Sequence, residues 1–305
     1  MDSLTHALVA SIVFTAIGHP ELVPFAALGA ICPDADFVFQ RFSDRDPKLY
    51  LFTHGGITHS ILGALTVSAA SAVLGLIAVT ALGYSASVPL AFVAAVAGVL
   101  THIGLDFLAF PGIPLLWPAT DKKYTLGIAA GPTPYLLVAS MVYGAFLLNG
   151  KASFDDPLLY VGFFALVMAV AAILKAWVTI KAKGMAIPGF SPLKWLIVAD
   201  EPASYRVSGY HLLRGSTPAV EFAKLGGVSA EEAATALSNP EVKRMRYHSY
   251  IVTAARKGRD IIFSDPLREH GYLWYPPYYK SYALSPEAQM PESDRQTIRD
   301  NAGKA

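Results

Sequence analysis

The chain has 305 residues, of which 53% are hydrophobic and only 15% are charged, and its formal net charge is +1. This composition is too apolar for an average soluble domain. The balanced charge, without a run of Lys and Arg interleaved with aromatic residues, gives no indication of nucleic-acid binding. Because most charged residues follow about residue 181, the sequence predicts a membrane part followed by a soluble part.

Six apolar stretches predict an all-α polytopic membrane helical bundle of about six spans over residues 1–185. The first stretch begins almost at Met1 and carries Asp2 where a signal peptide has basic residues, so we expect this helix to be retained. The second is interrupted near its end by Pro33, which disfavours helix at the preceding residue. The stretches cover residues 4–18, 21–39, 57–82, 88–110, 135–148 and 158–180.

The distribution of Lys and Arg predicts the orientation in the membrane, because basic loops stay in the cytoplasm. The loops at 41–53 and 111–131 and the segment after 181 are basic, whereas the turns at 83–87 and 149–156 carry one Lys between them. Six spans with both termini inside satisfy every loop. We therefore expect a multi-pass protein of the inner or plasma membrane, with its C-terminal part in the cytoplasm.

From residue 190 onward the pattern predicts a small soluble α+β domain that extends to residue 284. Residues 195–199 and 205–213 alternate like strands. The aromatic-rich segment 272–282 is expected to close the sheet. The polar tail over 285–305 is expected to be disordered.

Three local signals place helix starts and a turn in this soluble domain. Ser229, followed three residues later by Glu232, is typical of a capping box. Asn239 before Pro240 indicates the start of another short helix. Gly258 lies between two strand-like runs and predicts a hairpin.

Four polar motifs interrupt the apolar part of the chain and supply the ligand types of a hydrolytic metal site. Neutral imidazole and carboxylate together hold divalent ions such as zinc. By the predicted topology, every motif falls at the cytoplasmic end of a span, so motifs about a hundred residues apart would meet at one end of the bundle. The motifs are Asp2 with His6, Asp34 with Asp36, His54 with His59, and His102 with Asp106.

The spacing within each motif supports a metal site, although each motif also has a simpler interpretation. His102 and Asp106 are four residues apart and share one face of a helix. For such a pair taken alone, a hydrogen-bonded contact at the membrane surface explains the spacing as well as a metal site does. Asp34 and Asp36 repel each other unless a cation lies between them, and their alternative is a solvated loop. Ionisable groups in or near a membrane are rare and usually functional, which favours the metal site for the four motifs together.

The third motif combines ligand types with a helix start. Thr58 or Ser60 can cap the helix that follows, so part of this motif is expected to be structural. The same two hydroxyls would orient His59 as second-layer hydrogen-bond partners. Asp2 is either a ligand or a partner of His6.

The remaining histidines and the single cysteine have no partner at a ligand spacing. His19 beside Pro20 is expected to be a turn residue. Cys32 has no basic neighbour in sequence that would activate it, and we interpret it as a small apolar residue. Structural roles are expected for the three histidines of the soluble domain, His211, His248 and His270.

A hydrolase with this sequence would use water as its nucleophile. The chain contains neither a Gly-rich phosphate loop nor a nucleophile elbow, so a metal-activated water is the most economical choice. Asp34, Asp36, His59 and Asp106 are the predicted catalytic residues. The predicted ligands of one or more Zn²⁺ or other divalent ions are His6, Asp34, Asp36, His54, His59, His102 and Asp106.

The ordered set of motifs resembles the YdjM-type inner-membrane proteins, which are described as membrane-bound metal-dependent hydrolases. The resemblance covers roughly residues 1–180, and it includes the segment from Pro111 to Pro118. It implies a distant relation to zinc-dependent phospholipase C and the single-strand nucleases, and therefore a phosphoester, for instance of a lipid, as the substrate. Gly55 stands where the family usually has Arg, so a phosphate-binding or structural role of that Arg is absent here.

Two other classes of function use the same residues. Buried His and Asp could relay ions or protons in a transporter, although transporter sites usually lie near the membrane midplane among broken helices. A metal could also stabilise a non-catalytic membrane scaffold whose soluble domain recruits a partner. The position of the motifs at helix ends favours the enzyme.

Overall fold

A computed structural model of the protein describes residues 1–131, 133–273 and 279–286. The chain forms two compact units. The first consists of Met1–Phe42, Leu51–Trp195 and Tyr210–Ser216, and the second contains Ser43–Tyr50, Leu196–Gly209 and the described residues from Thr217 onward. Almost all of the tail predicted to be disordered lies outside the described residues.

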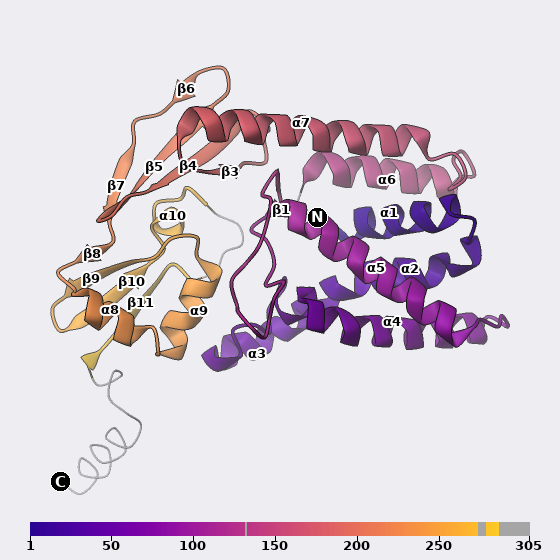
Figure 1. Ribbon diagram of the computed structural model, residues 1–305, viewed down its shortest axis with the longest axis horizontal. Coiled ribbons are helices and arrows are strands. Elements are labelled where there is room, and N and C mark those ends of the chain that lie inside the picture. The colour runs from indigo at the N-terminus through magenta and orange to yellow at the C-terminus, as the bar shows by residue number, and fades with distance from the viewer. Residues whose placement is uncertain (132, 274–278, 287–305) are drawn as a thin grey trace, which may run out of the picture. The chain divides into compact units, whose positions relative to one another are not determined.

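The first unit is built from helices (Figure 1). Most of them begin where the sequence supplies a cap or a proline: Ser60 accepts the Gly63 N–H at the start of α4, and Pro89 and Pro134 open α5 and α6. The α-helices are α1 (Ser3–Ala16), α2 (Val23–Ile31), α3 (Gln40–Arg45), α4 (Ile61–Ala81), α5 (Val88–Leu108), α6 (Pro134–Leu148) and α7 (Leu158–Ala182), and α3 passes into the second unit at Ser43.

Four helices of the described chain are long and apolar enough to cross a membrane, so the expected count of about six spans is not supported. Two of the six predicted spans form α1 and α6, which have only 14 and 15 residues. A helix needs about 17 residues or more to cross the hydrocarbon core. The four candidate spans are Pro20–Arg45, Ile61–Ala81, Val88–Leu108 and Leu158–Ala182.

The second apolar stretch changes its helix type at Pro33. The α-helix α2 ends at Ile31, and the chain continues as the 3-10 helix η2 (Cys32–Phe39). Proline removes an N–H donor and clashes with the preceding turn, which is the reason for the change. Asp34 and Asp36 both lie on η2. The two carboxylates therefore come from the irregular backbone that the sequence predicted after Pro33.

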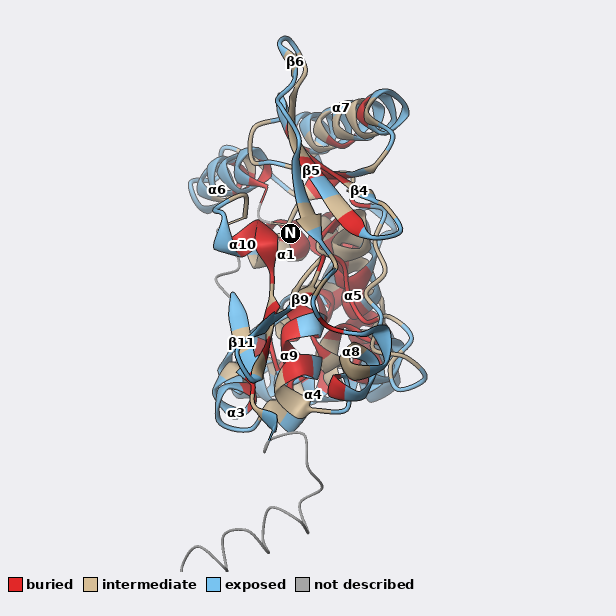
Figure 2. Ribbon diagram, turned by 90° about the vertical axis from the view of Figure 1, so that its left-hand side faces the viewer, coloured by how far each residue is buried: buried red, intermediate tan, exposed pale blue. Residues whose placement is uncertain are grey.

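Helices α2 and α5 pack with their backbones in close approach. A Cβ atom added to Gly98 would lie 2.1 Å from the carbonyl oxygen of Ala26, and one added to Gly29 would lie 2.3 Å from that of Ala95. Small residues at an interface allow this approach between membrane helices. Figure 1 shows α2, α4 and α5 together, and Figure 2 shows how much of α5 is buried.

Two short strands continue the chain after α5. β1 (Ala109–Phe110) pairs in parallel with β2 (Ala129–Ala130). Helices α6 and α7 follow, and most of their surface is exposed (Figure 2). The first unit therefore combines a tightly packed group of helices around α5 with a pair whose apolar surface is open.

The C-terminal part is rich in sheet, as the sequence predicted. One sheet has the order β3-β4-β5-β6, with β7 also paired to β5. A second sheet has the order β11-β10-β9-β8. The strands are β3 (Met185–Pro188), β4 (Lys194–Asp200), β5 (Ser204–His211), β6 (Gly215–Ser216), β7 (Val220–Ala223), β8 (Leu225–Gly226), β9 (Thr253–Lys257), β10 (Asp260–Ser264) and β11 (Ser281–Leu284).

Three short helices accompany the second sheet, and two begin at the predicted caps. Ser229 and Glu232 form the capping box of α8 (Ala230–Ala236). Asn239 caps α9 (Pro240–His248), and α10 spans Pro266–Glu269. The predicted hairpin joins β9 and β10, with Gly258 at φ +63°. Strand β11 closes the sheet against β10, while residues 274–278 of the predicted closing segment lie outside the described chain.

Candidate metal centre

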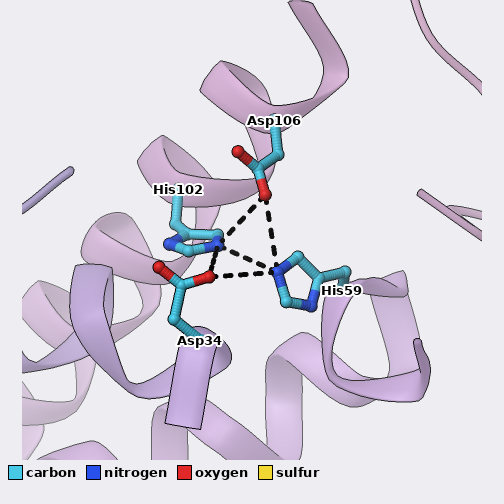
Figure 3. Close-up of side chains that lie close together, drawn as sticks. All are labelled: Asp34, His59, His102 and Asp106. Carbon is cyan, nitrogen blue, oxygen red and sulfur yellow. Dashed lines mark hydrogen bonds and ion pairs between the residues drawn. The ribbon is translucent and has the colours of Figure 1, made fainter. Parts of the chain in front are cut away.

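Four side chains from three separate segments meet at one end of the packed helices (Figure 3). Asp34 comes from η2, and His59 from η4 (Ile57–His59), the 3-10 turn before α4. His102 and Asp106 lie one turn apart near the end of α5. The helix face predicted from their spacing is thus directed at the other two residues. One ligand atom from each residue lies within 4.8 Å of all the others.

The two imidazoles form the buried side of this group. His59 Nε2 and His102 Nε2 are 3.0 Å apart, and both side chains are completely buried. His102 Nδ1 lies 2.7 Å from the carbonyl oxygen of Ala30. Because a carbonyl only accepts, Nδ1 carries the proton and Nε2 of the neutral ring presents a lone pair.

The same reasoning applies to His59. The Thr58 hydroxyl donates to Asp36 Oδ2, and its oxygen lies 2.9 Å from His59 Nδ1. That oxygen therefore accepts a hydrogen bond from Nδ1, which leaves the lone pair of a neutral His59 on Nε2. With both rings neutral, two lone pairs would face each other across 3.0 Å, an arrangement that either a metal ion or a proton between the two nitrogens relieves.

The carboxylates occupy the other two corners. Asp106 Oδ2 lies 3.5 Å from Nε2 of both histidines. Asp34 Oδ1 lies 3.5 Å from His102 Nε2 and 3.8 Å from His59 Nε2. Nitrogen and oxygen ligands of a tetrahedral zinc ion, bound at about 2.1 Å, are separated by about 3.4 Å. The five separations that involve a histidine nitrogen, 3.0–3.8 Å, are close to this value, and the two carboxylate oxygens lie within 4.8 Å of each other.

The electrostatics of the group also favour a cation. Two carboxylates lie close together, and Asp34 Oδ1 is buried without a hydrogen-bond partner among the described residues. Burial lowers the pKa of His59, but hydrogen bonds with Asp106 and Asp34 outweigh it and hold the pKa well above the ordinary value. The position thus attracts positive charge.

Asp36 and His54, both predicted ligands, lie next to this group, and His54 Nε2 is 4.0 Å from Asp34 Oδ1. Asp36 Oδ2 is 3.3 Å from His59 Nδ1, while Oδ1 is 2.9 Å from His54 Nδ1. The hydrogen bond with Asp36 raises the pKa of His54. Asp36 also accepts the backbone N–H of Gly55, whose φ of +70° suits glycine. These contacts orient His59, as does Thr58.

His6 is buried against the group from α1. Its ring stacks on that of His102 with centroids 3.9 Å apart, and its Nε2 lies 3.2 Å from Asp106 Oδ1, the oxygen turned away from the two clustered histidines. Neither ring nitrogen of His6 has a hydrogen-bond partner among the described residues. Asp2 caps α1 by accepting from the N–H and hydroxyl of Thr5. A ligand role for His6, Asp36 or His54 stays a prediction.

Some site residues were not identified from the sequence. Ser3 donates its hydroxyl to Asp34 Oδ2 at 2.5 Å, and the backbone of Ala30 fixes the tautomer of His102. Ser3 lies within the first polar motif, one turn before His6. This position was the only feature of the sequence that could have indicated its role. The carbonyl of Ala30 has no signal in sequence, because its contact depends on how α2 packs against α5.

The other histidines and Cys32 lie apart from the cluster. His19 bonds to the neighbouring Glu21 on the surface, and His211 accepts the N–H of Leu213. The ring of His270 packs at a tilt against that of Phe222. His248 packs with the rings of Tyr247 and Tyr279. Cys32 is a partly buried free cysteine.

Fold and site together define a helical membrane protein with a buried His/Asp group suited to a metal ion. The model of the YdjM inner membrane protein family matches residues 1–180. The chain belongs to this family, which confirms the resemblance seen in the motifs. No curated protein and no solved structure gives a match.

Proposed function

We propose that this protein is a membrane-bound metal-dependent hydrolase, in which Asp34, His59, His102 and Asp106 hold a divalent ion. The observation that carries the proposal is the pair of Nε2 atoms 3.0 Å apart, with a carboxylate oxygen at each of the two remaining corners. Zinc is the favoured ion because imidazole and carboxylate at tetrahedral spacing suit it. A bound divalent ion supplies Lewis acidity and lowers the pKa of water towards neutrality.

The four residues differ in solvent exposure, with the histidines on a buried side and the carboxylates on a partly exposed side. The side chains of His59 and His102 are fully buried, whereas those of Asp34 and Asp106 are 11% and 14% exposed. Substrate would therefore approach from the side of the carboxylates, and hydrolysis would need water to enter there as a fifth ligand, because four protein ligands fill the tetrahedron. Asp36 is saturated by hydrogen bonds to its neighbours, so we assign it the positioning of His59 in place of a catalytic step.

The substrate class and the orientation extend the family resemblance. We infer a phosphoester or related bond, for instance in a lipid, because the site lies at the ends of membrane helices. The basic loops support a site that faces the cytoplasm. Helix ends also favour an enzyme over a transporter, whose site is expected near the midplane.

The test combines metal content with hydrolysis. Protein purified in detergent without chelators is compared with the double variant His59→Ala, His102→Ala and with His19→Ala, which removes a surface histidine outside the site. We expect near-stoichiometric metal in the wild type and in His19→Ala, and none in the double variant. Phosphodiester and phospholipid cleavage should follow the metal content. Equal metal in all three proteins would contradict the assignment.

A metal-stabilised scaffold is the second candidate, because four protein ligands filling four corners is the arrangement of structural zinc sites. Substitution with Co²⁺ separates the two candidates, since its visible spectrum reports coordination number. A spectrum that changes on adding inorganic phosphate indicates a position open to substrate. An unchanged four-coordinate spectrum, together with no cleavage of any phosphoester tested, supports the scaffold.

A further inference from the structure

A groove separate from the metal centre runs along the exposed side of α7. Its volume is about 350 Å³, and its walls come from α7, the start of α6, strand β2 and the segment from Pro188 to Trp195. Nearly all the lining side chains are apolar. The volume lies at the lower end of the range of roughly 300–1,000 Å³ for small-molecule sites.

One stripe of α7 forms the length of the groove. The stripe follows the helical repeat, with neighbours three and four residues apart. Eleven residues of helix separate its ends, which is a length of about 16 Å at about 1.5 Å per residue. Half of a hydrocarbon core of about 30 Å has nearly the same thickness. The residues of the stripe are Phe163, Leu166, Val167, Val170, Ala171 and Leu174.

The C-terminal end of α7 has the features of a membrane interface. Lys181 and Lys183 follow the stripe, and the Lys181 ammonium lies over the ring of Trp177. Interfacial tryptophans and basic residues anchor spanning helices at the headgroup level. On the same side the groove is bordered by Tyr135, whose hydroxyl donates to the carbonyl of Phe190. The stripe is thus centred near the middle of α7, and the walls from Tyr135 and the segment from Pro188 to Trp195 extend the groove towards this interface.

We propose that this groove is a lipid site that holds one acyl chain of a membrane phospholipid. The occupant is identified by its surroundings, because α7 is a candidate membrane span and only 11% of its most apolar window is buried within the protein. A groove parallel to a spanning helix, about one leaflet long and apolar throughout, matches an extended acyl chain. Walls from three other segments distinguish it from the convex surface that ordinary annular lipid covers. The proposal does not depend on hydrolysis at the metal centre.

The matched pair Ala171→Trp and Ala172→Trp tests this site. Ala171 lines the groove, whereas Ala172 is exposed and lies outside the lining. Each full-length variant is placed in nanodiscs of phosphatidylethanolamine and phosphatidylglycerol with a trace of phospholipid carrying a diazirine in its acyl chain. After irradiation, cross-linked peptides are mapped by mass spectrometry.

We expect wild-type cross-links to concentrate at Tyr135 and between 188 and 195, and to fall at least fivefold in Ala171→Trp but not in Ala172→Trp. Val167→Trp, a second groove-filling variant, should act like Ala171→Trp. Unchanged far-ultraviolet circular dichroism and an unchanged thermal midpoint in each variant show that the helical unit is folded. Cross-links spread evenly over α6 and α7, or unaffected by both groove-filling variants, would overturn the proposal and leave annular lipid only.

Discussion

Each compact unit buries a group of charged side chains, and the two groups balance their charge differently. In the second unit, Asp265 and Arg268 form an ion pair with side chains 0% and 2% exposed. The Asp265 carboxylate also accepts the backbone N–H groups of Leu267 and Arg268 at the start of α10, so both oxygens are bonded. In the first unit, the N-terminal ammonium of Met1 pairs with Asp106, whereas Asp34 Oδ1 has no hydrogen-bond partner within the described chain.

The difference separates a structural role from a ligand-binding role. A buried ion pair whose charges and hydrogen bonds are satisfied needs no bound ligand. Removal of one partner lowers the stability of the fold. In the group of two carboxylates and two imidazoles, the Met1 ammonium balances Asp106, and a bound cation would balance Asp34. Variants of the first group should therefore change metal binding, and variants of the second should change stability alone.

The largest expected effect is on metal affinity in Asp106→Asn. The amide keeps the shape of the side chain but removes one of the two negative charges that face the imidazoles. Outer-layer partners of metal ligands contribute about 10–100-fold in affinity, so loss of a direct ligand should exceed 100-fold. Competition with a chelating dye measures the change. An affinity within threefold of wild type would remove Asp106 from the ligand set.

Arg268→Ala should destabilise the second unit by about 3–5 kcal/mol, because it leaves the buried Asp265 carboxylate without its counter-charge. Arg256→Ala is the control, since Arg256 pairs with Glu232 at the surface and exposed pairs contribute about 0–1 kcal/mol. Hydrogen exchange of the β9 and β10 amides measures the loss of stability in each of the two variants. Metal content should not change in either variant, and its loss in Arg268→Ala would contradict the separation of roles.

Gly98→Ala tests how packing holds the metal centre together. The added methyl would lie 2.1 Å from the Ala26 carbonyl, and overpacking of this kind costs about 1–3 kcal/mol. Because His102 lies one turn further along α5, the shift should weaken its contact with Ala30 and lower metal affinity. Gly104→Ala on the same helix meets no atom within 4 Å and should leave affinity unchanged. Equal affinity of the two variants would show that the close approach does not position His102.

The smallest expected effect is at the capping box of α8. Ser229→Ala should cost about 1 kcal/mol, because the Glu232 N–H loses its side-chain acceptor. Hydrogen exchange of the α8 amides measures this loss, and no change in their exchange would contradict it.

Glu232 adds a dependence on pH to the same helix. The hydrogen bond from the Ser229 backbone and the Arg256 guanidinium lower the pKa of Glu232 below its ordinary value of 4.5. A lowered folded-state pKa gives stability that is present above pH 4.5 and is lost as the pH falls through the folded-state pKa. Glu232→Gln should remove this acid dependence from the exchange of the α8 amides.

Local features of the protein were determined by the sequence itself. Pro33 ends an α-helix, Ser60, Ser229 and Asn239 cap helices, and Gly258 turns a hairpin, because each acts on backbone groups only a few residues away. The helix phase of His102 and Asp106 was equally local. The apolar stretches also predicted helices, but α1 and α6 proved too short for the expected count of spans.

Tertiary structure decided which polar groups meet. Nothing in the sequence ranked the seven predicted ligands, yet four of them direct an atom at one point. Asp36 faces Nδ1 of His59, and His6 faces Oδ1 of Asp106. These differences depend on the close approach of α2 and α5 and on the 3-10 turns that carry Asp34 and His59. Contacts between segments tens of residues apart set the direction of each side chain, and no local pattern encodes that direction.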